Sequence, residues 1–277
     1  MSAEDKLRDG LLDEALAELQ QQVRREPGKA AHRVFLFQLL TVLGQWDRAA
    51  TQLSVAGELD PANLAMVQTY REALRDEALR REIFAGRRSP LIFGDPDRWI
   101  ALLVQALQLE GAGANAQAAE SRAEAFDEAP ATAGTWNGSR FEWIADADSR
   151  LGPVLEVMLT SGYYWVPLHR IRRIHVDAPT DLRDVVWMPA QFTWANGGEA
   201  IGLIPTRYVG SETSPDARIR LSRMTQWAEP SPGVYMGEGQ RLLATDAGEY
   251  ALMDTRVVEL EVAETGTEAT ATAGTSG

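Results

Sequence analysis

The sequence contains no cysteine, which excludes disulfide bonds, thiolate metal sites and cysteine nucleophiles. A chain without cysteine suits a reducing compartment such as the cytoplasm. Lysine is almost absent too, since only Lys6 and Lys29 accompany the arginines. Acidic residues outnumber basic ones by 40 to 27, so the net charge is −13. A surface of this sign repels phosphate backbones and anionic lipids, which disfavours binding to nucleic acid or to a membrane surface.

Long hydrophobic runs are also missing, because no run approaches the roughly 20 residues that a membrane-spanning helix needs. The first residues, MSAEDKLRDG, are charged and lack the basic and apolar regions of a signal peptide. We therefore expect a soluble, cytoplasmic protein. Its 277 residues, 45% of them hydrophobic, are enough for one large globular domain or two ordinary ones.

A repeated pattern with a period of about 34 residues, typical of tetratricopeptide (TPR) repeats, runs through the first half of the chain. Each copy has a glycine, then small or apolar positions, then a proline. The three copies are Gly10, Ala15, Leu19 and Pro27; Gly44, Ala49, Leu53 and Pro61; and Gly113, Ala118, Ala125 and Pro130. The glycine ends one helix, the alanine lets two helices approach, and the proline ends the second. Residues 1–134 are therefore predicted to form a TPR-like α-solenoid, interrupted at 64–98 by a long helix that ends near Phe84 and a loop.

The second half has the pattern of strands and holds six of the eight tryptophans. Hairpins are predicted over 154–168 and over 185–205, the latter around the turn sequence Asn-Gly-Gly-Glu. Further strands are expected at 171–176 and within 240–262, and a helical segment around 215–227. The fold class is thus α+β, with a mainly antiparallel β domain over 135–262. Residues 263–277 have nothing to bury and are predicted to be disordered.

No pattern of residues indicates catalysis, a cofactor or a metal. The chain lacks paired histidines at helical spacing, a phosphate-binding loop and a nucleophile elbow. His169 and His175 would lie about 20 Å apart on a strand, too far to share a metal. Asp146 and Asp148 are interpreted as a solvated acidic loop. We predict a protein that is not an enzyme, with no catalytic, cofactor-binding or metal-binding residues.

Two features could bind a protein partner. Arg170, Arg172 and Arg173 form a basic group on an acidic chain, and alternation along a strand would place the first two on one face. The alternative is a solvated edge strand whose charges discourage pairing with other sheets. The second feature is the concave groove of a TPR array, to which Leu36, Leu40 and Trp99 could contribute. These three side chains could instead simply belong to the core.

Six segments, at 148–157, 163–171, 182–190, 204–212, 224–227 and 239–254, follow the order found in a known family. With the TPR-like half they resemble the ImpE/TagJ family, also called SciE, of type VI secretion accessory proteins. The chain departs from the family pattern at Val209, where proline is expected. The resemblance implies a cytoplasmic adaptor that binds the amino-terminal helix of the small sheath subunit, of TssB type. It also implies a link to the ClpV ATPase that disassembles contracted sheaths, and it carries over no catalytic residues.

Two other functions stay open at this point. One is a general TPR co-chaperone or secretion chaperone for a different partner. The other is an enzyme with a pocket in the β domain, which would need residues such as Arg207, Asp246 and His169 to meet around a cleft.

Overall fold

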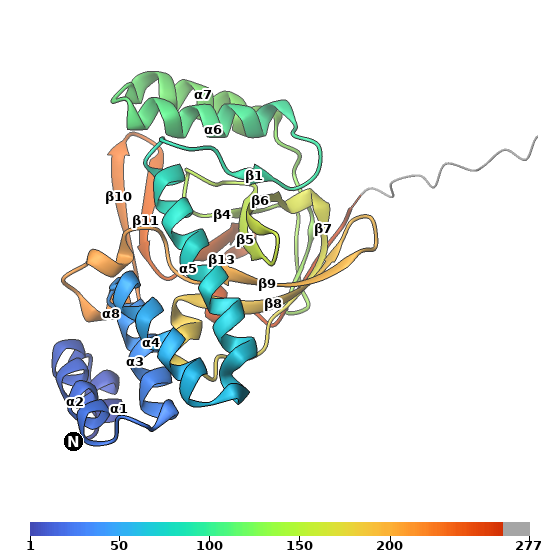
Figure 1. Cartoon of the computed structure of the whole chain (residues 1–277). Coiled ribbons are helices and arrows are strands. Elements are labelled where there is room, and N and C mark those ends of the chain that lie inside the picture. Colours follow the sequence, from blue (N-terminus) through green and yellow to red (C-terminus); the bar gives the residue numbers. More distant parts are fainter. Residues whose placement is uncertain (263–277) are drawn as a thin grey trace, which may run out of the picture.

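The computed structural model describes residues 1–262 (Figure 1), so the tail predicted to be disordered, 263–277, lies outside the described residues. The helices of the described part are α1 (Ala3–Arg8), α2 (Leu12–Arg25), α3 (Ala30–Val42), α4 (Trp46–Leu59), α5 (Leu64–Phe84), α6 (Arg98–Gly111), α7 (Asn115–Glu128) and α8 (Ala217–Arg220). None of the helices within residues 1–262 combines the length and apolar character that a membrane span requires. Helices dominate the first half and strands the second, which confirms the α+β class.

The glycines of the repeat make the turns between paired helices, as predicted. Gly10, Gly44 and Gly113 stand between α1 and α2, α3 and α4, and α6 and α7, with φ values of +78°, +66° and +78°. Residues with a Cβ atom rarely adopt this conformation, which ends the first helix of each pair. Ala49 and Ala118 are completely buried. The repeat pattern therefore identified the helix pairs correctly.

The helix pairs are not all neighbours in space. In the first part α2 packs on α3 and α4 packs on α5, so α1 to α5 form one stack of helices. The segment 85–97 follows α5, and the third pair, α6 and α7, lies at the other end of α5 from α1 and α2 (Figure 1). The predicted long helix is α5, and it ends at Phe84 as expected.

A nine-stranded sheet forms most of the second half, in the order β1-β6-β5-β9-β8-β7-β14-β2-β3. All neighbouring strands pair antiparallel except β1 and β6. Its strands are β1 (Leu91–Ile92), β2 (Gly134–Trp136), β3 (Ser139–Phe141), β5 (Val154–Leu159), β6 (Gly162–Pro167), β7 (Ile171–His175), β8 (Trp187–Trp194), β9 (Glu199–Pro205) and β14 (Val257–Leu260). Strands β4 (Ile144–Asp146), β12 (Leu242–Thr245) and β13 (Gly248–Ala251) form a second sheet, and β10 (Thr225–Ser231) pairs with β11 (Val234–Gly239).

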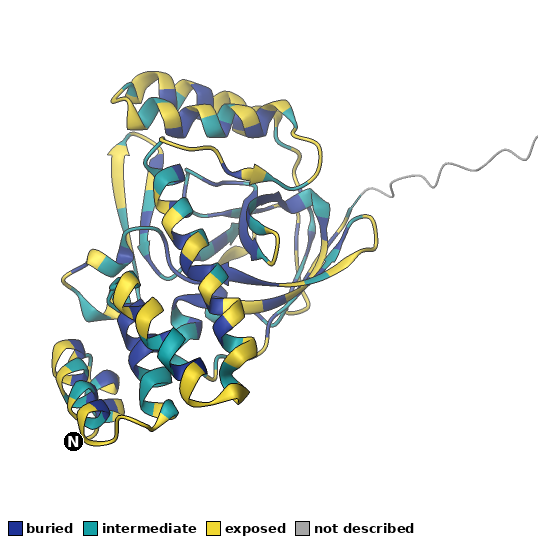
Figure 2. Cartoon of the chain, viewed as in Figure 1, coloured by how far each residue is buried: buried dark blue, intermediate teal, exposed yellow. Residues whose placement is uncertain are grey.

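The central strands are buried on both faces, which explains why their sequences are continuously apolar rather than alternating. In β5, Val154 and Met158 belong to the core cluster that the helices cover, while Leu155 and Val157 belong to a second cluster on the opposite face. Figure 2 shows the resulting dark band of buried residues through the centre of the molecule. Successive residues of such a strand point to opposite faces. Glu156 therefore faces the helices, and this position matters below.

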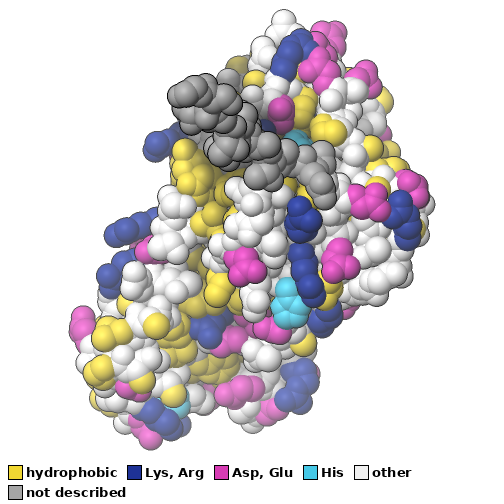
Figure 3. All heavy atoms as spheres, turned by 90° about the vertical axis from the view of Figure 1, so that its right-hand side faces the viewer, with side chains coloured by type: hydrophobic (Ala, Val, Ile, Leu, Met, Phe, Trp, Pro, Cys, Tyr) yellow, Lys and Arg dark blue, Asp and Glu magenta, His cyan; other side chains and the backbone are white. Residues whose placement is uncertain are grey.

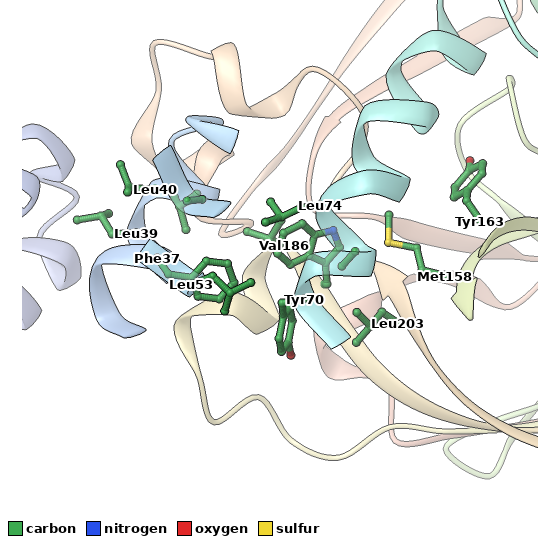
Figure 4. Close-up of a cluster of buried hydrophobic side chains, with 14 of the residues drawn as sticks. Phe37, Leu39, Leu40, Leu53, Tyr70, Leu74, Met158, Tyr163, Val186 and Leu203 are labelled. Atoms are coloured by element: carbon green, nitrogen blue, oxygen red, sulfur yellow. The ribbon is translucent and has the colours of Figure 1, made fainter. Parts of the chain in front are cut away.

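The predicted hairpins are confirmed by the antiparallel pairs β5–β6 and β8–β9. The predicted helical segment at 215–227 is correct only for α8, because β10 already begins at Thr225. The boundary expected at residues 134/135 falls at the start of β2, yet β1 from the first half joins the large sheet. One core cluster includes Leu53 and Leu74 together with Leu203 (Figure 4). The division into domains 1–134 and 135–262 stays a prediction.

Candidate partner-binding site

A groove lies between α4 and α5, on the side of these helices that faces away from the sheet. It encloses a cavity of about 420 Å³, which we call the α4–α5 groove. Its lining residues are Trp46, Asp47, Ala50, Leu53, Ser54, Arg71, Leu74, Arg75, Ala78 and Arg81. Small side chains at 50, 54 and 78 leave the space open, and Leu53 and Leu74 are buried beneath it. The groove is therefore apolar at its base and open along the helices.

Three arginines of α5 and one carboxylate, Asp47 of α4, line the α4–α5 groove, so its rim has a net positive charge. Arg71 donates a hydrogen bond of 3.4 Å to Ser54 Oγ, and the guanidinium of Arg81 lies 5.7 Å from the ring centroid of Trp46. Among residues 1–262, none of Arg71, Arg75 and Arg81 has a carboxylate oxygen within 4.0 Å. On a chain with a net charge of −13, three cations without ion pairs are available to an acidic partner.

The apolar residues predicted to bind a partner lie in the core of the free protein. Leu36 and Leu40 of α3 are 4% and 0% exposed, and Trp99 of α6 is 4% exposed. Trp99 packs near His169, with a distance of 6.2 Å between the ring centroids. The three side chains come from two separate helix pairs, and the structure does not bring them together into one surface. Their direct contact with a partner stays a prediction.

The predicted arginine group is divided among different contacts. Arg170 ends a short 3-10 helix, and its guanidinium donates hydrogen bonds to the carbonyl of Phe93 at 2.9 Å and to Asp97 at 3.2 Å. Arg172 and Arg173 are both exposed, because a bulge between β7 and β8 interrupts the alternation there. The expectation that Arg170 and Arg172 share one strand face is therefore wrong. Figure 3 shows that cationic and acidic side chains are intermixed on the face towards which β7 to β9 extend.

A network of charged side chains lies buried between α5 and the sheet. Arg80 of α5 donates to Glu156 at 2.5 Å and to Glu77 at 3.1 Å, and Arg241 pairs with both Glu156 and Asp146. All five side chains are less than 5% exposed. Burial raises the pKa of Glu156, but Arg80 and Arg241 outweigh it and lower the value to about 2. Burial raises the pKa of Asp146 to about 6, although Arg241 lowers it.

This network is a structural core rather than a site that meets a substrate, because its side chains are almost completely buried. It also corrects the interpretation of Asp146 and Asp148 as a solvated loop. Asp148 is completely buried, and its carboxylate accepts hydrogen bonds from Arg150 Nε at 2.8 Å and from the backbone N–H of Gly237 at 2.8 Å. One weak sign of this buried network is visible in the sequence, since Glu156 interrupts an otherwise apolar strand.

The residues proposed for an enzyme pocket lie in three different surroundings. Arg207 is buried and donates to the carbonyls of Thr41 and Val42 at 2.8 Å each. Asp246 is exposed in the β12–β13 turn, while His169 lies 3.6 Å from Asp97, near α6. No hydrogen bond or ion pair links these three residues in the described part of the chain. Within residues 1–262, no group of three or more histidine, aspartate or glutamate side chains has an arrangement that could hold a metal ion.

Comparison with known proteins gives consistent results. A family model described as ImpE protein matches residues 138–259. The type VI secretion system accessory component TagJ of Pseudomonas aeruginosa is 52% identical over 261 residues, which cover 94% of this chain and 92% of that protein. The chain belongs to the ImpE/TagJ family. A crystal structure of a Vibrio parahaemolyticus protein has the same fold, with a TM-score of 0.84 and 25% identity over 94% of this chain and 97% of that one.

The match to the ImpE model covers the β region but neither α4 nor α5, so the α4–α5 groove lies outside the matched segment. Sequence reasoning also missed the arginines of this groove. Arg71 and Arg75 are four residues apart, a spacing that places them on one helix face. Only the packing of α5 against the sheet shows that this face is left uncovered.

Proposed function

We propose that this member of the ImpE/TagJ family is an accessory component of a type VI secretion system and acts as a cytoplasmic adaptor without enzymatic activity. In this proposal it binds the amino-terminal helix of the small sheath subunit, of TssB type, and thereby links the sheath to its ClpV-type ATPase. The α4–α5 groove is the proposed site. The observation that carries the proposal is an open apolar groove between two helices whose rim has unpaired arginines.

The shape of the α4–α5 groove suits a helix. Amphipathic helices dock by inserting apolar side chains, three or four residues apart, into a groove between helices. Ala50 and Ala78 keep the opposing walls low, and Trp46 offers a large, half-buried ring at one end. Burial of the partner's apolar side chains against the base of the groove and the half-buried ring of Trp46 would supply most of the binding energy.

The charge of the rim determines which helix fits. Arg71, Arg75 and Arg81 would lie beside carboxylates on the flank of the docked helix. Each exposed ion pair adds only about 0–1 kcal/mol to the binding free energy, so these pairs determine the orientation of the helix more than its affinity. We expect the partner helix to have one apolar face with acidic residues along its edge.

The test is calorimetry with a synthetic peptide of the amino-terminal helix of the small sheath subunit, titrated into the full chain at two salt concentrations. We expect a dissociation constant in the micromolar range or below, which corresponds to a binding free energy on the order of −8 kcal/mol. Salt should weaken binding only moderately, because the Debye length falls from about 10 Å at 0.1 M to about 3 Å at 1 M while apolar contacts are unaffected. No binding at tens of micromolar protein would contradict the proposal.

Matched variants locate the site. Arg75→Glu reverses a charge on the rim and should weaken binding about tenfold, whereas Arg172→Glu reverses an exposed charge elsewhere and should change nothing. Ala50→Trp should fill the groove and abolish binding, and Ala123→Trp, on the exposed side of α7, is its control. If Arg172→Glu weakened binding as much as Arg75→Glu, the predicted arginine group and not the groove would hold the helix.

A further inference from the structure

A second groove lies between the carboxyl end of α7 and strand β4. It encloses about 350 Å³ and we call it the α7–β4 groove. Its walls include Phe126, Pro130, Trp143 and Pro153, and Ala145 and Ala244 line it from adjacent strands. Most of its lining residues are apolar, Asp146 and Ser149 being the polar ones, and the groove is open to solvent.

Exposed aromatic side chains gather at this groove. In residues 1–262, three aromatic residues are strongly exposed: Phe126 at 39%, Trp143 at 41% and Tyr235 at 46%. Two of them line the groove. The third, Tyr235, does not line it, but its backbone exchanges hydrogen bonds of 2.8 and 2.9 Å with the lining residue Ser149, so β11 lies beside the groove. A single exposed apolar residue needs no explanation, but a concentration of aromatic residues around one cavity marks an interaction site.

The groove is formed in the free protein. Gly152 has φ +53°, and a Cβ atom at this position would lie 2.4 Å from Cε1 of Phe126. Phe126 therefore packs directly on the backbone of Gly152, which fixes the distance between α7 and the β region. A preformed site avoids part of the entropy loss on binding.

Two carboxylates without ion pairs, Asp246 and Glu249, lie beside the groove. Glu142, which precedes Trp143 and pairs with Arg140 at 3.5 Å, donates its backbone N–H to Asp246 Oδ1 at 2.7 Å. Glu249 is the cross-strand partner of Ala244, so it stands next to the groove on β13. Among residues 1–262, neither Asp246 nor Glu249 has a Lys, Arg or His nitrogen within 4.0 Å.

We propose that the α7–β4 groove binds a short segment of another protein in which apolar side chains are flanked by lysine or arginine. The apolar side chains pack between Phe126 and Trp143, and the cations face Asp246 and Glu249. A second copy of this chain is a poor occupant, because its net charge is −13. Residues 263–277 are a poor occupant too, since they contain two glutamates and no cation. This surface is separate from the α4–α5 groove and does not depend on the function proposed for it.

The experiment measures the fluorescence anisotropy of labelled peptides added to the full chain. The probe is a synthetic peptide of Leu and Trp flanked by Lys and Arg, and its matched control has Glu in place of every Lys and Arg. We expect the basic peptide to bind at least about tenfold more tightly than the acidic one, with an affinity that falls as salt rises. Equal affinity of the two peptides would overturn the proposal, as would no binding of the basic one.

Variants test the place of binding. Trp143→Ala should weaken binding of the basic peptide by about tenfold or more, as for a central aromatic anchor. The double change Asp246→Asn with Glu249→Gln should weaken it less, and Arg75→Glu in the other groove should have no effect. Thermal unfolding of each variant checks that the fold is intact. If Trp143→Ala fails to fold, the double variant Asp246→Asn with Glu249→Gln tests the site in its place. Full affinity in both folded groove variants would overturn the proposal.

The absence of cysteine allows a direct location of the peptide. A benzophenone attached at Ala147→Cys, which lines the α7–β4 groove, should cross-link the basic peptide, while the same group at Ala50→Cys in the α4–α5 groove should not. Cross-linking at Ala50→Cys alone would refute the assignment to this groove. If sedimentation shows that the protein alone associates, and that Trp143→Ala abolishes the association, a second copy is the occupant and the proposal is wrong.

Discussion

Helix α5 and the α6–α7 pair are held to the β region in different ways. Glu77 and Arg80 of α5 enter a buried network of ion pairs with the sheet, surrounded by apolar contacts. The ion pairs of α6 and α7, such as Arg98–Glu124 and Arg122–Glu110, join these two helices to each other. The helices α6 and α7 contact the rest of the molecule mainly through apolar side chains. Glycines also contribute, since Gly86 packs closely against the carboxyl end of α6. The repeat pattern therefore defines a helix pair but does not decide where that pair docks.

The largest effect is expected from removing the central cation of the α5 network. Arg80→Met leaves Glu156 and Glu77 buried with too few partners, and should lower the free energy of unfolding by about 3–5 kcal/mol. Denaturant unfolding measures the loss. The control is Arg87→Met, which removes a solvent-exposed pair with Glu82 and should leave stability unchanged. Similar losses in both variants would show that the buried network does not hold α5 to the sheet.

This network also marks the limit of what the sequence predicts. The α+β class, the turn glycines and the length of α5 follow from local patterns, because turns and helix ends depend on residues close in sequence. The partners Glu156 and Arg241 are 85 residues apart, and no local pattern indicates that they meet. Asp148 was assigned to solvent for the same reason, since its partner on β11, the backbone N–H of Gly237, lies 89 residues away.

The candidate site was predicted less well than the fold. A concave helical surface was expected, but Leu36, Leu40 and Trp99 proved to be core residues. Periodicity identifies the apolar face of a helix and cannot distinguish a face that packs internally from one that awaits a partner. The exposed arginines of α5 could be recognised only after the sheet was seen to occupy the other side of that helix.

A smaller effect is expected where two helices of a pair cross. Ala49 of α4 and Ala118 of α7 are both completely buried, so Ala49→Leu and Ala118→Leu should each cost roughly 1–3 kcal/mol through overpacking. Thermal and denaturant unfolding give the values. The exposed neighbours provide controls, Ala50→Leu on α4 and Ala123→Leu on α7. If Ala49→Leu were no more harmful than Ala50→Leu, the repeat would not describe the crossing of α3 and α4.

The pH dependence of stability distinguishes Asp76 of α5 from Glu156 of β5. Burial, together with the charges of Glu72 and Glu77, raises the pKa of Asp76 to about 7 from 3.8. The folded protein therefore binds a proton at Asp76 that the unfolded chain releases between pH 4 and 7, so this residue lowers stability as the pH rises through that range. Asp76→Asn should stabilise the protein at pH 8 by about 1 kcal/mol, less than the full shift implies because the side chain is partly solvated.

The expected gain from Asp76→Asn should vanish near pH 4, where Asp76 is protonated in the folded protein. Glu156 acts in the opposite sense: its pKa of about 2 lies below the ordinary 4.5, so its stabilisation is complete above pH 4.5 and is lost as the pH falls towards 2. Unfolding measured from pH 3 to 8 separates the two residues. If Asp76→Asn raised the free energy of unfolding equally at pH 4 and at pH 8, the increase would come from packing and not from the charge of Asp76.

The smallest effects concern the polar contact between the sheet and the segment that leads into α6. Arg170 holds that segment by donating to the carbonyl of Phe93 and to Asp97, but it is only half-buried. Arg170→Gln should therefore cost about 1 kcal/mol, the value of a hydrogen bond to a partly solvated group and much less than Arg80→Met. Arg172→Gln and Arg173→Gln should have no measurable effect on unfolding. Arg173 lies 3.8 Å from Glu259 in an exposed pair, and Arg172 donates an exposed hydrogen bond of 3.3 Å to the carbonyl of Ala195. A loss at Arg170 as large as that at Arg80 would mean that the α6–α7 pair is fixed as firmly as α5, and the contrast between the two attachments would disappear.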